Sequence, residues 1–121
     1  MGKRILIIED ELILAEALKE KLTHIGHEVE AVFDGESGLE KIREKKPDLL
    51  ILDILLPGIN GYEVMERLKK ENISLPILVV SNSGQPVEID KARELGANDF
   101  IVKVAFSLKE VEEKIKKLIG S

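Results

Sequence analysis

Three acidic residues and one lysine stand at the ends of short apolar runs, and together they could bind a metal and react with phosphate. Glu9 and Asp10 follow "RILII", Asp53 ends "DLLILD", and Lys103 ends "DFIVK". Charges beside so many aliphatic side chains are costly unless they are paired. If the fold brings the carboxylates together, Mg²⁺ is the hard cation that would keep them ionised. A carboxylate beside Mg²⁺ and lysine is set up as a nucleophile toward a phosphoryl group.

A serine follows a fourth apolar run and extends this chemistry. Ser81 ends "PILVVS", and its hydroxyl can form a hydrogen bond with an oxygen of a phosphoryl product. Each position also has a plainer interpretation. Glu9 and Asp10 can favour a helix N-terminus, and Asp53 can begin a turn. Lys103 can lie over an apolar surface, and Ser81, with Ser83 as its rival, can simply end a strand.

The elements that must position these residues alternate along the chain. Strands are predicted at 4–8, 27–32, 48–53, 76–81 and 99–103. Helices are predicted around an apolar seam from Ala15 to Ile25, over 35–45, from Gly61 onward, over 86–95 and after an N-cap at Ser107. In the last helix, the residues predicted to face inward are Leu108, Val111, Ile115 and Leu118.

Near-continuous apolar strands are typical of a parallel sheet that helices cover on both faces. Right-handed crossovers then make a doubly wound α/β fold, with "HEVEAV" (27–32), the most polar strand, at an edge. In such folds, ligands bind beyond the carboxyl ends of the strands, where the winding direction reverses. Glu9, Asp10, Asp53, Ser81 and Lys103 are all predicted at that end.

Length and composition limit the class of protein. The 121 residues make one domain, 1–121, and 44% hydrophobic with 34% charged residues suit a globular chain. A net charge of −5 argues against direct binding to nucleic acid, and the absence of cysteine removes disulfides and thiolate sites. With neither a signal peptide nor a membrane span in the sequence, we expect a cytoplasmic protein.

Four segments together resemble the receiver domains of bacterial response regulators. They are "IIED", "LILDILLPGINGYEV", the strand that ends in Ser81, and "DFIVK". The resemblance implies a flavodoxin-like fold, a five-stranded sheet in the order 2-1-3-4-5 flanked by five helices. It also implies Asp53 as phosphoacceptor, Glu9 and Asp10 with Asp53 as the Mg²⁺ site, Lys103 as the lysine that pairs with the phosphoryl group, Ser81 as the switch hydroxyl and Phe100 as the switch aromatic.

The function implied by this resemblance is a phosphorylation-dependent switch in a two-component pathway. The phosphoryl donor would be a phosphohistidine on a sensor kinase or a phosphotransfer protein. The domain would catalyse only its own phosphorylation and dephosphorylation. Leu14 and Ala17, on one face of the first helix, resemble the patch by which receivers dock a kinase helix bundle.

One departure from the family keeps a second function open. Receivers usually follow the lysine with proline in a cis peptide and an aromatic residue, whereas this chain has "KVAF", with Val104 after Lys103. A cis bond before a residue other than proline costs about 2.5–4 kcal/mol, so we expect the Lys103–Val104 bond to be trans. The alternative is therefore a receiver-like interaction module that works without phosphorylation.

Other classes of function fit less well. A nucleotide or flavin binder would use G-x-G-x-x-G or a P-loop, and neither motif is present. A phosphoester hydrolase suits three acids and Mg²⁺, but no second nucleophile is evident. His24 and His27 flank Gly26 at the far end of a helix, where we expect surface residues rather than ligands or phosphocarriers.

Overall fold

Five strands and five α-helices alternate in the computed structural model, which describes residues 2–82, 85–105 and 107–120. The strands are β1 (Arg4–Ile8), β2 (Glu28–Val32), β3 (Leu49–Asp53), β4 (Ile77–Ser81) and β5 (Asp99–Val102). The helices are α1 (Leu12–Ile25), α2 (Gly35–Glu44), α3 (Gly61–Lys70), α4 (Pro86–Glu94) and α5 (Leu108–Ile119), and a 3₁₀ turn, η1 (Lys103–Ala105), follows β5.

All five strands form one parallel sheet in the order β2-β1-β3-β4-β5, which confirms the predicted doubly wound, flavodoxin-like architecture. β2 lies at an edge, as its polar sequence predicted, and β1, β3 and β4 are central. Because all strands run the same way, their carboxyl ends meet at one end of the sheet. The winding reverses between β1 and β3, so the crevice of the fold opens there.

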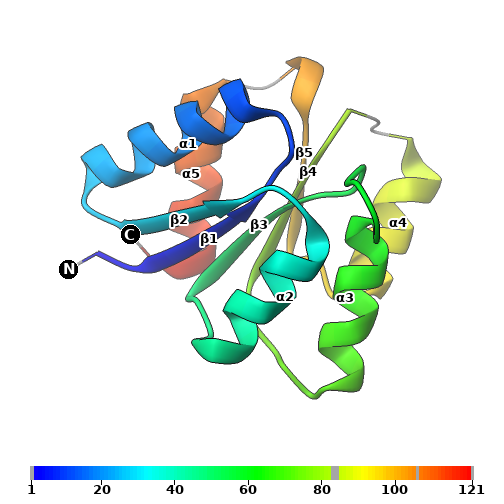
Figure 1. Ribbon diagram of the computed structural model, residues 1–121. Coiled ribbons are helices and arrows are strands. Elements are labelled where there is room, and N and C mark those ends of the chain that lie inside the picture. The colour runs from blue at the N-terminus through cyan, green and yellow to red at the C-terminus, as the bar shows by residue number, and fades with distance from the viewer. Residues whose placement is uncertain (1, 83–84, 106, 121) are drawn as a thin grey trace.

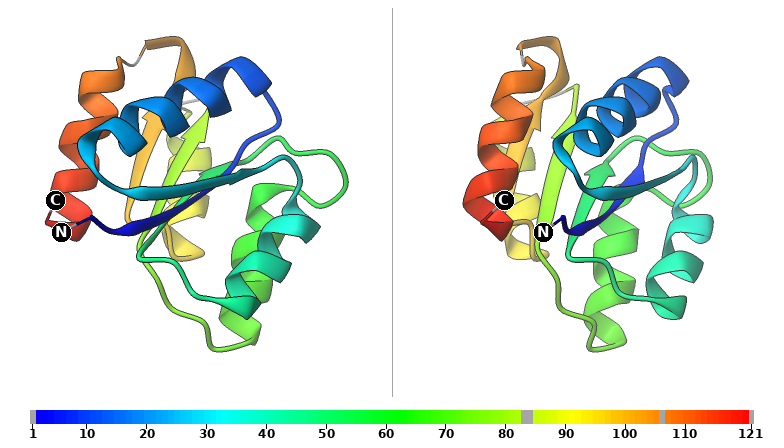
Figure 2. Two further views of the ribbon diagram at one scale, coloured as in Figure 1. Left: turned by 60° about the vertical axis from the view of Figure 1, so that its left-hand side comes forward. Right: turned by 90° about the vertical axis from the view of Figure 1, so that its left-hand side faces the viewer.

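The helices cover the two faces of the sheet unequally. α1 and α5 lie on one face, and α2, α3 and α4 lie on the other (Figures 1 and 2). Alternate strand residues point to opposite faces. Ile5 and Ile7 therefore join the core under α1 and α5, whereas Leu6 and Ile8 join the core under α2, α3 and α4. This two-sided burial explains why the strands read as unbroken apolar runs.

Two local predictions about burial were wrong. His27 is only 6% exposed, and its Nδ1 accepts a hydrogen bond from the Lys3 backbone N–H at 3.0 Å. Leu108 was expected in the core beside Val111 and Ile115 but is 36% exposed, because it stands in the first turn of α5 beyond the edge of the packed core. None of the helices in the described ranges combines the length and apolar character needed to cross a membrane.

Gly61 is the residue that lets α3 begin directly under the end of β3. Its backbone N–H donates to the Ile54 carbonyl at 2.8 Å. A Cβ at this position would collide with the backbone carbonyl of Asp53. Only glycine fits so close to another backbone segment without a shift of the chain.

We predict that Gly61→Ala lowers the free energy of unfolding by about 1–3 kcal/mol, because the new methyl group must push the Asp53 backbone away. Gly58→Ala is the control. Gly58 has a positive φ of +76°, but a Cβ there meets no atom within 4 Å, so the cost is about 1 kcal/mol of backbone strain. Urea unfolding measures the free energy of unfolding of both variants. Equal stability of Gly61→Ala and the parent would contradict the close approach of Gly61 to the Asp53 backbone.

Candidate functional site

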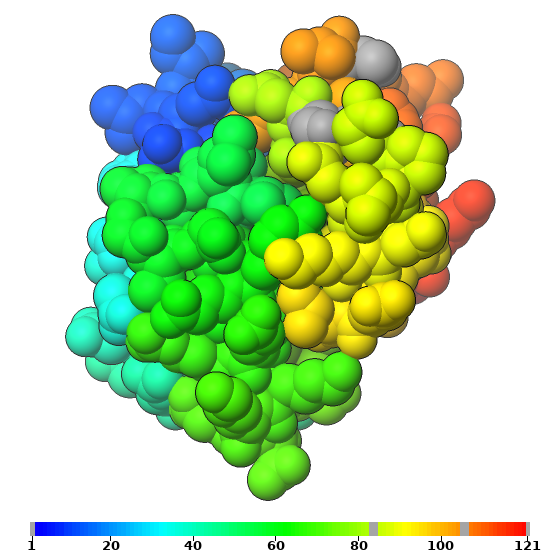
Figure 3. All heavy atoms as spheres, turned by 90° about the vertical axis from the view of Figure 1, so that its right-hand side faces the viewer, coloured from blue at the N-terminus to red at the C-terminus, as the bar shows by residue number. Residues whose placement is uncertain are grey.

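The predicted site residues converge at the carboxyl end of the sheet. Glu9 and Asp10 follow β1, Asp53 ends β3, and Ser81 ends β4. Lys103 begins the 3₁₀ turn after β5. In Figure 3 the start of α1, the loop after β3 and the segments after β4 and β5 gather at the same end of the molecule.

The three carboxylates form a cluster that fits a metal. Glu9, Asp10 and Asp53 each offer a carboxylate oxygen, and these oxygens lie within 4.8 Å of one another. Glu9 and Asp53 are 2% and 3% exposed, whereas Asp10 is exposed. Asp53 is thus covered, not open at the mouth of the crevice. Like charges this close repel, and oxygen ligands of this kind suit a hard divalent cation.

Lys103 lies between the carboxylates. Its Nζ is 2.9 Å from Asp53 Oδ2 and 2.9 Å from Glu9 Oε1, and its side chain is 7% exposed. The third contact is with Glu11 Oε2, also at 2.9 Å. The ammonium group therefore bridges the ends of β1 and β3 and the residue that precedes α1.

The substitution of valine for proline does not turn Lys103 away from the site. The Lys103–Val104 peptide is trans, as predicted, since the peptide bonds of the described residues include none that is cis. Lys103 begins η1, and Val104 is 81% exposed. The predicted aromatic of the motif, Phe106, lies outside the described residues.

Burial and neighbouring charges shift two pKa values in the cluster. Burial raises the pKa of Glu9 to about 7, with a further rise from the charge of Asp53, although hydrogen bonds from the Glu11 backbone and Lys103 lower it. For Lys103, burial alone would lower the pKa. The hydrogen bonds to Glu11, Asp53 and Glu9 outweigh burial and raise it. Lys103 therefore stays charged, whereas the Glu9 carboxyl group is partly protonated near neutral pH.

The pKa of Glu9 predicts a pH dependence of stability in metal-free buffer. Between pH 4.5 and about 7 the folded state binds more protons than the unfolded state, so the free energy of unfolding falls as pH rises. Glu9→Gln should remove about 1–3 kcal/mol of that fall. Urea unfolding at pH 5, 6 and 7 tests it, and parallel curves for parent and variant would contradict the assignment.

Ser81 and Phe100 lie on the neighbouring strands β4 and β5. Val80 is the register partner of Asp53, so Ser81 stands one position farther toward the site, where it is 4% exposed. Phe100 on β5 pairs with Val79 and is half-buried against the core under α2, α3 and α4. Their positions agree with the predicted ones, and their switch roles stay predictions.

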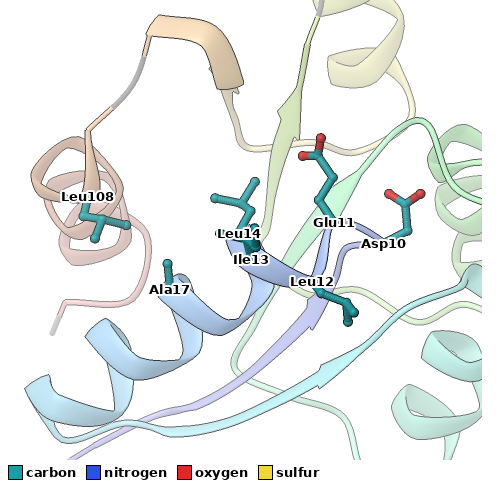
Figure 4. Close-up of a pocket in the computed structure, with 7 residues that line it drawn as sticks. All are labelled: Asp10, Glu11, Leu12, Ile13, Leu14, Ala17 and Leu108. Carbon is teal, nitrogen blue, oxygen red and sulfur yellow. The ribbon is translucent and has the colours of Figure 1, made fainter.

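A hollow of ≈ 850 Å³ adjoins the cluster between α1 and the start of α5 (Figure 4). Leu14 and Ala17, the predicted docking residues, lie beside it, and both are half-buried. The more exposed apolar residues beside the hollow are Leu12 at 60% and Ile13 at 89%, and neither was among the predicted docking residues. The remaining lining residues are Asp10, Glu11 and Leu108.

Glu11 contacts Lys103 at the site but was not among the predicted site residues. It was visible as the third acid of "EDE", directly after the two that were chosen. Nothing in that spacing told whether its side chain turns toward solvent or toward Lys103. The contact joins residues 92 positions apart, so only the fold shows it.

Comparison of the sequence with known proteins finds response regulators and their receiver domain. The sequence pattern of the response regulator receiver domain matches residues 5–116. The alkaline phosphatase synthesis transcriptional regulatory protein PhoP of Bacillus subtilis is 34% identical over 119 residues, which are 98% of this chain and 49% of that protein. The transcriptional regulatory protein CrdR of Helicobacter pylori is 35% identical over 121 residues, 99% of this chain and 56% of CrdR. The chain thus spans about half the length of these relatives.

Solved structures show the same fold. A CheY-like response regulator receiver domain protein from Methanospirillum hungatei superposes with a TM-score of 0.91 at 28% identity, over 99% of this chain and 95% of that one. A DNA-binding response regulator of the LuxR family from Staphylococcus aureus gives a TM-score of 0.87 at 27% identity, over 96% and 98% of the two chains.

Proposed function

We propose that this chain, which belongs to the response regulator receiver domain family, is a phosphorylation-dependent switch that accepts a phosphoryl group on Asp53 in the presence of Mg²⁺. One observation carries the proposal. The buried Asp53 carboxylate lies 2.9 Å from the Lys103 ammonium, and carboxylate oxygens of Glu9 and Asp10 lie within 4.8 Å of it. A carboxylate in that setting is a nucleophile with its charge compensation already in place.

The donor set fits magnesium. Glu9, Asp10 and Asp53 supply carboxylate oxygens only, and the cluster carries more negative charge than the one ammonium group offsets. Mg²⁺ takes one or two carboxylates and keeps water molecules that phosphate oxygens can replace. When bound, it would supply positive charge to the oxygens of the transferring phosphoryl group.

The proposed transfer needs no further reactant. An Oδ lone pair of Asp53 forms the new O–P bond as the P–N bond of a donor phosphohistidine breaks, and the imidazole nitrogen keeps that electron pair. Lys103 follows the negative charge onto the transferred phosphoryl group and donates hydrogen bonds to its oxygens. Water later attacks the phosphorus, which restores the carboxylate and releases phosphate. The domain acts in this way only on its own aspartate.

The switch would read the new group through Ser81 and Phe100. Ser81 ends β4, the strand that pairs with β3 beside Asp53. Its hydroxyl can donate a hydrogen bond to a phosphoryl oxygen. Movement of Ser81 toward that oxygen would leave space into which the half-buried Phe100 ring turns. A small local charge change would thereby alter the surface near β5.

The proposed donor is a sensor histidine kinase or a histidine phosphotransfer protein in the cytoplasm. A helix of such a partner would dock in the hollow beside Leu14 and Ala17, with Ile13 at its exposed edge. The hollow adjoins Asp10 and Glu11, so a helix seated there would bring its phosphohistidine toward the acidic cluster.

The first test is intact mass after incubation with acetyl phosphate, with and without Mg²⁺. We expect one phosphoryl group on the parent, only with Mg²⁺, and none on Asp53→Asn, because the amide is not a nucleophile toward phosphorus. Asp90→Asn, an exposed change on α4, is the matched control and should react like the parent. No addition to the parent would favour the phosphorylation-independent interaction module instead.

The docking face has its own test. With a phosphorylated kinase or phosphotransfer protein that is active on the parent, Leu14→Glu and Ile13→Glu should lower transfer at least tenfold relative to transfer from acetyl phosphate. A buried charge in an apolar contact costs this much or more. Ile13→Glu is included because Ile13 is 89% exposed and its change spares the core. If the ratio of transfer from the protein partner to transfer from acetyl phosphate is unchanged in both variants, the partner docks elsewhere.

A further inference from the structure

Lys103 has no hydrogen-bond donor left for a phosphoryl group. An ammonium group carries three N–H donors. The Lys103 ammonium contacts three carboxylates, those of Glu9, Glu11 and Asp53, at 2.9–3.0 Å. A phosphoryl oxygen on Asp53 can accept from Lys103 only if one of these contacts is released.

Glu11 is the partner that can leave at least cost. Glu9 and Asp53 are 2% and 3% exposed, so without Lys103 their charges would be left in a poorly solvated place. The Glu11 side chain is 54% exposed, so water solvates its carboxylate as soon as it turns away. Glu11 also lies outside the cluster of Glu9, Asp10 and Asp53 that fits a cation.

Local structure does not explain where the Glu11 side chain lies. Glu11 is the N-cap residue of α1, but its side chain makes no capping hydrogen bond. Its backbone N–H donates to Glu9 Oε2 at 3.0 Å, which holds the backbone of residue 11 beside the cluster. The side chain then reaches Lys103 across the mouth of the site, 92 residues away in sequence.

From these contacts we infer that Glu11 is a positioning residue that holds Lys103 in the resting state and competes with the phosphoryl group for its ammonium. This inference rests on the proposed function. As Asp53 Oδ bonds to the phosphorus of acetyl phosphate, the P–O bond to acetate breaks and acetate leaves with the electron pair. Lys103 then exchanges its Glu11 contact for a phosphoryl oxygen, with no proton transferred. Glu11 therefore slows phosphorylation of Asp53.

The experiment compares phosphorylation rates with acetyl phosphate and Mg²⁺ for the parent, Glu11→Gln and Glu16→Gln. Glu16 is an exposed residue of α1, the helix that Glu11 precedes, so its change removes the same charge close by and serves as a matched control. Glu11→Gln should react about two- to fivefold faster than Glu16→Gln, the rate equivalent of one exposed ion pair. An equal or slower rate overturns the inference.

Two further measurements separate competition from a structural or long-range charge effect. Glu11→Asp keeps the charge but is one methylene shorter, so it should lose the contact and react faster, like Glu11→Gln. If it reacts at the parent's rate, the contact is not the cause and the inference fails. Trifluoroberyllate, a tetrahedral stand-in for the phosphoryl group, should bind Glu11→Gln more tightly than Glu16→Gln, as read from half-maximal shifts in melting temperature. Equal binding also overturns it.

Failure of this inference differs from failure of the proposed function. A parent that gains a phosphoryl group, with Glu11→Gln no faster, leaves the proposed function standing and removes the role of Glu11. Absence of any addition to both parent and variant removes the proposed function and, with it, this inference.

Discussion

The Glu9 and Asp53 carboxylates are buried at one end of the sheet, and the Lys103 ammonium between them offsets the cost of that burial. Two carboxylates that have lost most of their water repel one another, and burial of either charge without a counter-charge is costly. The contacts of Lys103 join the end of β1, the end of β3 and the turn after β5. The same contacts offset only part of the negative charge of the site, so any added charge, from a cation or a phosphoryl group, must rearrange them.

The rest of the fold holds this arrangement in place. Parallel strands buried on both faces give the backbone few ways to move, and each strand delivers its last residue to the same end of the sheet. The close approach of Gly61 to the Asp53 carbonyl sets α3 directly beneath the loop that follows β3. A rigid scaffold with a compensated but charged site is suited to a switch, because a local change in charge cannot be absorbed by the core and must move the polar groups around it.

Much of the candidate site was predictable because apolar runs mark the strands. Asp53, Ser81 and Lys103 each end such a run, so a parallel sheet had to bring them to one end. Predictions that depended on side-chain direction were less successful. Leu108 was assigned to the core by helical spacing, yet the first turn of α5 extends past the packed surface. His27 was assigned to the surface because it flanks Gly26 at a helix end, yet it is buried and accepts a hydrogen bond from the Lys3 backbone N–H.

The order of elements, the edge position of β2 and the end of the sheet that carries the acids follow from the sequence alone, because hydrophobic period and strand direction are local properties of the chain. The three-way coordination of Lys103 does not. It joins Glu9 and Glu11 to a residue more than 90 positions away, and it depends on how far the turn after β5 carries the lysine across the sheet. Tertiary structure alone decided that Glu9 is buried while Asp10 and Glu11 are exposed, and that Glu9 and Glu11 reach the lysine, because burial and distance are properties of the packed molecule.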